Sequence, residues 1–324
     1  MIRFPEMNLQ ADYELAARGS SKSKNVRSTS AMTVAKKTSR FNIQSWQKRD
    51  WKGTIMRRLI FAIPLAMFLA ACATSPTGRT QLMLVPPDLA IDESRMAYEQ
   101  TLGELTDSGQ MLYDPALAER VERITGRLVA AAVQTWPHTA GWEWSVVLVD
   151  DPEMVNAWCM AGGRMAIYSG LVTKLDPSDD ELAHVMGHEI AHAVANHSAE
   201  QMSLAILQGL AVLAIEIETE DRGTATAADM LATVALGLPN SRGAEYEADQ
   251  LGMELAYKAG YEPAAAVTLW DKMRAEDGGA GVLQFLSTHP NPDNRAARLA
   301  IQADQLRNQP PPRPPQPYPV RIHP

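Results

Sequence analysis

The feature that most constrains this chain is the pentapeptide HEIAH at positions 188–192, which lies in a segment with the pattern of an amphipathic helix. Ser178 can cap the start of that helix, and the acidic residues 179–181 fall in its first turn, where the helix dipole favours negative charge. Helical spacing places residues i and i+4 on one face, so both imidazoles can reach one ion. The sequence therefore predicts a helix over 178–198 that carries two metal ligands.

The residue types of this pentapeptide indicate zinc chemistry. Imidazole is a common zinc ligand, and zinc lowers the pKa of a bound water to about 7. Glu189 stands next to His188 and can take a proton from such a water and pass it to a leaving amine. We therefore expect one Zn²⁺ per chain, with His188 and His192 as ligands and Glu189 as the catalytic base of peptide hydrolysis.

A third protein ligand must come from elsewhere in the chain. One class of zinc proteases uses a His six residues after the second ligand, with a Gly at the third position. Here those positions hold Ser198 and Ala195, which excludes that class. His197 is out of register, so we assign it a structural or surface role. The other class takes a Glu from a later helix.

The segment 245–249 of the predicted helix 242–258 offers two such glutamates. Glu247 falls on a stripe of polar residues that we expect to face solvent, whereas Glu245 flanks the apolar stripe. Asp249 lies one turn after Glu245 on the same side. We expect Glu245 to be the third metal ligand and Asp249 either to orient a zinc-bound His or to donate a proton.

The remaining pattern indicates an α+β fold that is mostly helical, with strands grouped early and helices on both sides. Strands are predicted over 144–149, 155–160 and 164–168, the last two joined as a hairpin. Further helices are predicted over 88–105, 114–134, 200–216, 225–237, 262–275 and 292–307. The apolar runs 204–217 and 225–238 are short, so we expect a pair of core helices, with a mobile plug or a lipid-facing hairpin as the alternative.

The N-terminal region has the pattern of a targeting segment. Residues 56–58 (Met-Arg-Arg) are positive, and residues 59–71 form an apolar run too short to span a bilayer, which needs about 20 residues. The sequence Leu69-Ala70-Ala71-Cys72 resembles the bacterial lipobox, in which the Cys is lipidated and becomes the new N-terminus. A plain secretion signal, an anchor or a mitochondrial transit peptide are the alternatives.

These features predict the organisation of the chain and its partners. Residues 59–324 hold 17 Lys and Arg against 34 Asp and Glu without a basic stripe, so we expect no nucleic-acid partner. We expect membrane attachment through lipid on Cys72. Cys159, within an apolar run, is then a small buried residue rather than a nucleophile. The predicted segments are a non-native upstream extension (1–55), a lipoprotein signal peptide (56–71), a tether (72–87), a catalytic domain (88–307) and a Pro-rich tail, extended or disordered (308–324).

Several of these motifs together resemble one family. HEIAH at 188–192 followed by Ser241-Arg242-x-x-Glu245-x-x-Ala248-Asp249 is similar to the gluzincin metallopeptidases, which include HtpX, the CAAX prenyl proteases, BepA, LoiP and the mitochondrial Oma-type peptidases. The segment 156–163 (NAWCMAGG) and Ser287-Thr288-His289-Pro290 with Arg295 also match. The resemblance covers roughly residues 78–306 and fits the soluble, lipid-anchored members best. The family usually has Pro where this chain has Ala161.

The resemblance implies further roles. The segment matching 156–168 is an edge strand that pairs with an extended substrate, which makes Asn156, Ala157, Gly162 and Gly163 substrate-binding candidates. His289 is expected near the metal, where it polarises the scissile carbonyl or occupies the open zinc position in a resting form. Arg295 binds a carboxylate near the site or pairs within the fold, the latter being favoured.

The resemblance also implies a function in protein quality control of the bacterial cell envelope. We expect a periplasmic, lipid-anchored zinc metalloendopeptidase, attached to the outer membrane, that cleaves unfolded or misassembled proteins. The alternative is a periplasmic assembly factor or chaperone lipoprotein with a retained zinc site. BepA-like chains carry a helical-repeat domain after the peptidase, whereas only about 20 residues follow Ile301 here, which favours the peptidase.

Overall fold

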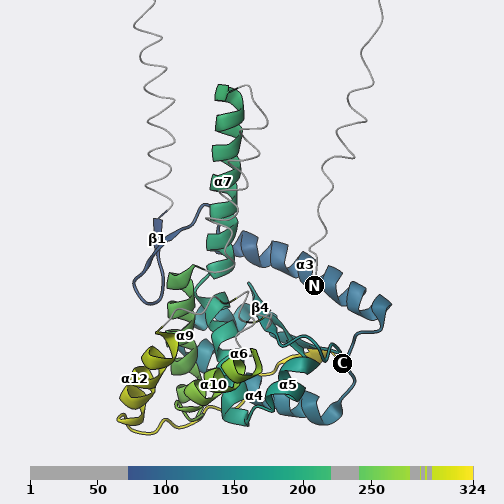
Figure 1. The fold of residues 1–324 in the computed structure, drawn as a ribbon, viewed down its shortest axis with the longest axis vertical. Coiled ribbons are helices and arrows are strands. Elements are labelled where there is room, and N and C mark those ends of the chain that lie inside the picture. Colours follow the sequence, from purple (N-terminus) through teal and green to yellow (C-terminus); the bar gives the residue numbers. More distant parts are fainter. Residues whose placement is uncertain (1–71, 220–240, 278–284, 286–288, 290–293, 324) are drawn as a thin grey trace, which may run out of the picture. The chain divides into compact units, whose positions relative to one another are not determined.

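The computed structural model describes residues 72–219, 241–277, 285, 289 and 294–323, all of which belong to one compact unit (Figure 1). Its α-helices are α3 (Pro87–Ser108), α4 (Pro115–Thr135), α5 (Ser169–Leu175), α6 (Asp179–Val194), α7 (His197–Thr219), α9 (Arg242–Lys258), α10 (Ala265–Asp277) and α12 (Arg295–Arg307). Its strands are β1 (Cys72–Thr74), β2 (Thr80–Leu82), β3 (Ser145–Val149), β4 (Ala157–Met160), β5 (Arg164–Tyr168) and β6 (Arg321–His323). The predicted α+β, mostly helical fold is confirmed.

Four strands form the main sheet in the order β4-β5-β3-β6. β4 and β5 are the predicted antiparallel hairpin, and β3 runs parallel to both β5 and β6. Along β3, Val146 and Leu148 pack into the core around α4 and α6, whereas Val147 and Val149 pack against Tyr98 of α3. Burial of the strand on both faces explains its continuous apolar sequence.

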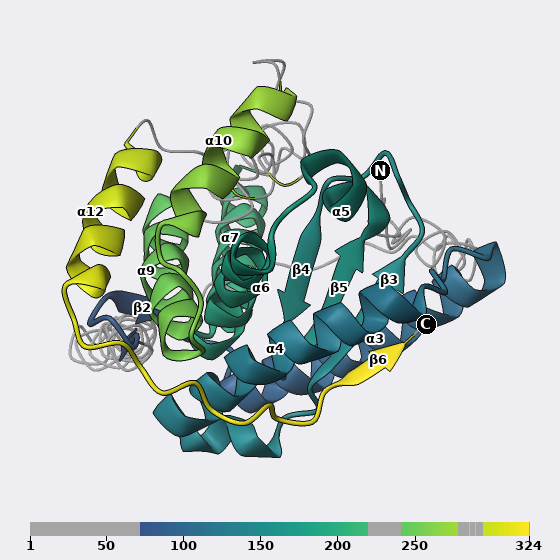
Figure 2. The ribbon, with the colours of Figure 1, turned by 90° about the horizontal axis from the view of Figure 1, so that it is seen from below.

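Helix α6 crosses the middle of the domain between β4 and α9 (Figure 2). Ser178 caps it as predicted, because its hydroxyl accepts a hydrogen bond from the Glu181 N–H while the Glu181 carboxylate accepts one from the Ser178 N–H. Residues 181–194 are all buried. The HEIAH pentapeptide thus lies on a helix that is held on every side.

Two glycines let α6 and α9 approach each other closely. A Cβ on Gly252 would lie 2.7 Å from the backbone nitrogen of His188, and one on Gly187 would lie 2.9 Å from the Gly252 carbonyl oxygen. Neither position has room for a side chain. This contact brings the first turn of α9, with Glu245, against the face of α6 that carries the two histidines.

The segment 72–87, predicted to be a tether, is instead folded onto the domain. β1 and β2 pair as a hairpin, and Arg79 in the turn between them bonds to Glu200 of α7 and Glu247 of α9. The turn residues that suggested a tether, Gly78 among them, form the hairpin turn. This stretch is ordered by buried polar partners that lie far away in the sequence. No local sequence pattern predicts such an arrangement.

The Pro-rich tail is also part of the domain, contrary to the boundary predicted at 307. The Tyr318 N–H donates to the Gly126 carbonyl of α4, and β6 adds a parallel strand beside β3. Extended, Pro-rich backbone can lie along a surface, and the free edge of β3 provides its hydrogen-bond partners. The prediction of an extended conformation was right, and the alternative of disorder was wrong.

Helix α7 differs from the prediction in its start and in its packing. The break between the helices falls at Ala195 and Asn196 rather than after residue 198, and Asn196 has a φ of +57°. Beyond its first two turns α7 projects away from the sheet and the other helices (Figure 1), and Ile206, within the apolar run 204–217 that was predicted to form a core helix, is 48% exposed. The predicted helix 225–237 lies outside the described residues. Among the helices described, none is both long and apolar enough to cross a membrane.

Candidate metal centre

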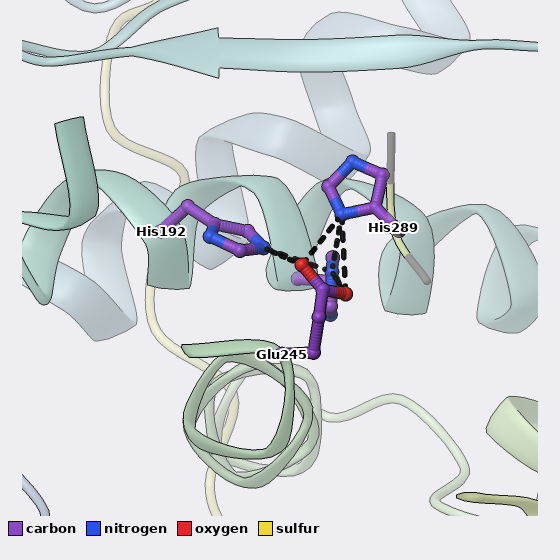
Figure 3. Close-up of side chains that lie close together, drawn as sticks. His192, Glu245 and His289 are labelled. Carbon is purple, nitrogen blue, oxygen red and sulfur yellow. Dashed lines mark hydrogen bonds and ion pairs between the residues drawn. The ribbon is translucent and has the colours of Figure 1, made fainter. Parts of the chain in front are cut away.

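Four buried side chains from three parts of the chain point at one another. His188 and His192 come from α6, Glu245 from α9, and His289 from the segment between α10 and α12 (Figure 3). One donor atom of each lies within 4.8 Å of the donors of the other three. All four side chains are at most 7% exposed. The structure thus brings together the three predicted ligands and the predicted neighbour His289.

The spacing of the donors matches a four-coordinate site. His188 Nε2 lies 3.0 Å from His192 Nε2, 3.3 Å from His289 Nδ1 and 3.4 Å from Glu245 Oε2. His289 Nδ1 lies 3.1 Å from Glu245 Oε1, and His192 Nε2 lies 3.4 Å from the same oxygen. A tetrahedron with metal–nitrogen distances of about 2.0–2.1 Å has edges of roughly 3.3 Å. The four residues could therefore hold one metal ion.

Glu189 and Glu245 are buried carboxylates whose pKa values are shifted in opposite directions. Burial raises the pKa of Glu189, and its Oε1 accepts no hydrogen bond from any described residue, although His289 Nε2 lies 3.5 Å away. Burial alone would also raise the pKa of Glu245, but the hydrogen bond with His188 and the electrostatic interaction with the His192 ring hold it well below its usual value. Glu245 is thus an anion suited to a cation, and Glu189 is a carboxylate with a free acceptor.

Two hydrogen-bond networks lie behind the histidines of α6. The first, which we call the His188 arm, consists of Asp249 and Arg295. Asp249 Oδ1 lies 3.1 Å from His188 Nδ1, the ring nitrogen turned away from the other donors. Arg295, only 2% exposed, donates to Asp249 Oδ1 at 2.6 Å and to Glu245 Oε2 at 3.1 Å, and it stacks on Trp270. Of the two roles open to Asp249, this geometry supports the orientation of His188. Arg295 pairs within the fold, and its partners are carboxylates of the site.

The second network, the His192 arm, was not predicted. His197 Nδ1 lies 2.8 Å from His192 Nδ1, and His197 Nε2 lies 3.2 Å from Glu247 Oε2. His197 is 2% exposed and Glu247 3% exposed, which contradicts the solvent-facing position expected for Glu247. Arg79 and Thr77 of the N-terminal hairpin donate to the Glu247 carboxylate. Burial would raise the pKa of Glu247, but the hydrogen bonds with His197, Ser75, Arg79 and Thr77 hold it well below its usual value.

Comparison with known proteins agrees with this site. The model of peptidase family M48 matches residues 115–302, more than half of the chain, from the start of α4 into α12. This chain belongs to peptidase family M48.

Relatives fall into two named groups. The mitochondrial metalloendopeptidase OMA1 of Arabidopsis thaliana is 36% identical over 163 residues, which cover 50% of this chain and 32% of the relative. OMA1 of Schizosaccharomyces pombe is 32% identical over 217 residues, covering 65% of this chain and 61% of the relative. The beta-barrel assembly-enhancing protease of Escherichia coli is 26% identical over 271 residues, covering 80% and 54%. The M48 chain thus spans about a third to three fifths of these relatives.

The edge strand predicted to bind substrate lies beside α6. Among the described strands β4 has a strand neighbour on one side only, β5, and Ala157 and Cys159 face the core that includes α6. Asn156 is 8% exposed, and its side-chain oxygen has no hydrogen-bond partner among the described residues. The Val155 carbonyl, just before β4, accepts a hydrogen bond from the Phe285 N–H. In this M48 chain Phe285, four residues before His289, therefore adjoins the start of the edge strand.

The two glycines of the hairpin have an internal explanation. Gly162 and Gly163 have φ values of +85° and +86°, and both are buried. A Cβ on Gly162 would lie 2.8 Å from Ile91, and one on Gly163 would lie 2.5 Å from Trp144. The positive φ values and the side chains on the Cβ side therefore account for both glycines within the fold itself, and their role in substrate binding stays a prediction. Ala161 occupies the second position of the Met160–Gly163 turn, which Pro favours in turns of types I and II.

Two further residues near the site are His184 and Cys159. His184 is buried, and its Nε2 lies 2.9 Å from the Glu262 carbonyl oxygen rather than at the donor cluster, so it is a neighbour and not a candidate ligand. Burial raises the pKa of the Cys159 thiol well above its usual value. A buried thiol of this kind is not a nucleophile at neutral pH, as the sequence predicted. The sequence motif at 287–290 lies outside the described residues except for His289.

Proposed function

We propose that this M48 chain is a zinc-dependent metalloendopeptidase. The observation that carries the proposal is the convergence of three imidazoles and one carboxylate beside a buried glutamate with a free acceptor oxygen. This donor set suits zinc, and the donor spacings of 3.0–3.4 Å fit tetrahedral zinc. His188, His192 and Glu245 would hold the ion. When bound, zinc lowers the pKa of a water and polarises a carbonyl oxygen.

The remaining chemistry belongs to the residues of the chain. Glu189 accepts a proton from the attacking water at Oε1 and delivers it to the departing amine. Burial raises the pKa of Glu189 and so brings it closer to the working pH. An extended polypeptide pairs with the free edge of β4, where the backbone near Asn156 and Ala157 supplies hydrogen bonds that do not depend on side chains. This mode of binding suits unfolded substrates.

His289 occupies the position that catalysis needs to be open. Catalytic zinc sites have three protein ligands and leave the fourth position to water or substrate, whereas here His289 Nδ1 lies beside the other three donors. This supports the second of its two expected roles, a ligand of a resting form. Cleavage then requires His289 to leave the donor cluster. His289 can afterwards contact the substrate carbonyl.

Casein cleavage by the purified protein, with and without chelator, tests the proposal. We expect chelator to abolish cleavage and zinc to restore it. Glu189→Gln should bind zinc as the native chain does but lose at least 100-fold in cleavage rate, because the base is gone. Full activity of Glu189→Gln, or activity that chelator leaves unchanged, would refute the mechanism.

We extend the proposal to the bacterial cell envelope, with lipid on Cys72 as the anchor to the outer membrane and misassembled envelope proteins as substrates. The lipobox pattern and the similarity to the beta-barrel assembly-enhancing protease support this. Cys72 is exposed and opens β1, so an anchored domain would lie close to the membrane. Globomycin-sensitive processing, and release of Cys72→Ala from membranes, are the expected results. A native protein that fractionates with the soluble proteins would refute the anchor.

An assembly factor is the second candidate function, favoured by the name of the same relative. The two functions differ in what Glu189→Gln does in a deletion strain. If assembly of outer-membrane proteins is restored by Glu189→Gln as well as by the native chain, the assembly function stands without the peptidase. Restoration by the native chain alone supports the peptidase.

A further inference from the structure

The His192 arm can be assigned donor by donor. His192 Nε2 faces the other donors of the site, so metal binding there leaves the ring proton on Nδ1. The His192 Nδ1–H then donates to His197 Nδ1 at 2.8 Å. The remaining ring proton of His197 is on Nε2, which donates to Glu247 Oε2 at 3.2 Å. Each nitrogen of the arm has one consistent role, and the arm ends on a carboxylate.

Glu247 in turn is held by the N-terminal hairpin. Its Oε2 accepts a hydrogen bond from Arg79 Nε at 2.8 Å, and its Oε1 accepts from Thr77 Oγ1 at 2.8 Å and from the Thr77 N–H at 3.3 Å. Among the described residues, Arg79 is the one arginine or lysine that pairs with this carboxylate. A carboxylate that is 3% exposed depends on such partners, because burial of an unpaired charge is costly.

The local fold of residues 75–79 is suited to present these donors. The Ser75 N–H donates to the Arg79 carbonyl, the Gly78 N–H donates to the Ser75 carbonyl, and Gly78 has a φ of +90° that favours glycine. Arg79 is fixed from its far side by two hydrogen bonds of 2.6 and 2.7 Å to Glu200 of α7. Gln81 donates to the Ala195 carbonyl at the end of α6. The hairpin is thus bound both to Glu247 and to the helix that carries His192.

We infer that residues 75–81 are a positioning element of the metal site: through Arg79 and Thr77 they fix Glu247, which through His197 sets the tautomer and orientation of His192. The residues of this element touch neither metal nor substrate. Outer hydrogen bonds of this kind typically change metal affinity by 10–100-fold when they are removed. The inference rests on the proposed metal site, and its catalytic consequence rests on the proposed peptidase function.

The test compares two half-buried arginines. Arg79→Met removes a donor to Glu247, and Arg120→Met is the matched control, because Arg120 is 25% exposed against 24% for Arg79 and also forms an ion pair, with Asp179 at the start of α6. Zinc affinity is measured by competition between the metal-free chain and a chromophoric chelator. The visible absorption of the Co²⁺-loaded chain reports the geometry of the ligands. Thermal unfolding reports the loss of stability in each variant.

We expect Arg79→Met to weaken zinc binding about 10-fold and to shift the Co²⁺ absorption, whereas Arg120→Met retains native affinity and absorption. Glu247→Gln should weaken binding by about 10–100-fold. The inference is overturned if Arg79→Met binds zinc like the native chain, or if Arg120→Met weakens binding equally. If Glu247→Gln does not fold, the two arginine variants alone decide the matter. A native chain that binds zinc but cleaves no casein would refute the peptidase function and leave this comparison valid.

Discussion

The two histidines of α6 that would bind the metal are supported in different ways. In the His188 arm a carboxylate, Asp249, lies directly beside the imidazole, and a buried arginine lies behind it. In the His192 arm a second imidazole stands between the ligand and the carboxylate of Glu247, and the arginine behind it is partly exposed. The first arm is built from α9 and α12, and the second reaches the N-terminal hairpin.

This difference appears in the protonation of the two histidines. Burial alone would lower the pKa of His188, but its hydrogen bonds with Asp249 and Glu245 raise it to about 9. Burial lowers the pKa of His192 well below its usual value, since the charge of Glu245 is offset by neighbouring imidazoles. Of these two rings, His188 is therefore the one that carries the additional proton in the metal-free chain. Burial thus keeps His192 neutral and ready to bind.

Of the substitutions in and around the two arms, Glu245→Ala should weaken zinc binding the most, because Glu245 contacts the rings of both His188 and His192. Loss of this ligand should weaken zinc binding by more than the roughly 100-fold upper range for outer hydrogen bonds, and casein cleavage should disappear. Metal content after dialysis and chelator competition measure the change. Zinc binding of Glu245→Ala within 10-fold of the native chain would exclude Glu245 as a ligand.

Arg295→Met should cost more stability than any substitution in the His192 arm. Arg295 is almost fully buried and forms ion pairs with two carboxylates, so its removal takes a hydrogen-bonded cation from both Glu245 and Asp249 and should lower the free energy of unfolding by about 3–5 kcal/mol. Arg79→Met should lower the free energy of unfolding by only about 1–3 kcal/mol, because Arg79 is 24% exposed. Urea unfolding of the zinc-loaded chains gives both values. Equal losses would show that burial does not distinguish the two arms.

Asp249→Asn tests whether the direct carboxylate is the stronger support. We expect zinc affinity to fall by about 10–100-fold, at least as far as for Glu247→Gln, because the charge next to His188 is lost without an intervening ring. The same chelator competition gives both values. If the arms are independent, the double variant should show the sum of the two free-energy losses within about 0.5 kcal/mol. A much smaller combined loss would mean that the arms act as one network.

The sequence predicted the His188 arm better than the His192 arm, for a physical reason. Helical periodicity places Glu245 and Asp249 beside the apolar stripe of α9, and α6 packs there, so the prediction of their position held. The same periodicity places Glu247 with Gln250 and Glu254 on a polar stripe. That reasoning assumes a helix buried on one side only. The N-terminal hairpin covers the Glu247 side with hydrogen-bond donors rather than apolar groups.

Long-range polar pairing explains the other misses as well. Arg79 and Glu247 are 168 residues apart, and no local pattern joins them. His197 was set aside because it stands out of register for a ligand; its spacing of five residues from His192 was the available signal for an outer partner. The conformation of the tail was predicted from composition alone. The strand β3 was predicted, but its pairing with β6 of the tail was not. The capped start of α6 and the three predicted strands depend on local sequence, and their predicted bounds lie within two residues of those in the structure.

The pH dependence of the metal-free chain is the smallest expected effect and separates the arms most directly. Because the pKa of His188 is raised from about 6.5 to about 9 on folding, its contribution to stability is fully present below pH 6.5 and is lost as the pH rises towards 9. The slope is at most about 1.4 kcal/mol per pH unit. The pKa values of His184 and His192 are lowered, so these two are neutral in the folded and unfolded chain above about pH 7 and add no slope.

Urea unfolding in chelator at pH 6.5, 7.5 and 8.5 measures this slope, and the two arms predict different variants. Asp249→Asn should flatten it, because the hydrogen bond that favours the charged His188 is gone. Glu247→Gln should leave the slope of the native chain, since His197 separates that carboxylate from a ligand that stays neutral. A slope that Glu247→Gln flattens and Asp249→Asn retains would place the proton on the side of His192 and reverse the assignment of the two arms.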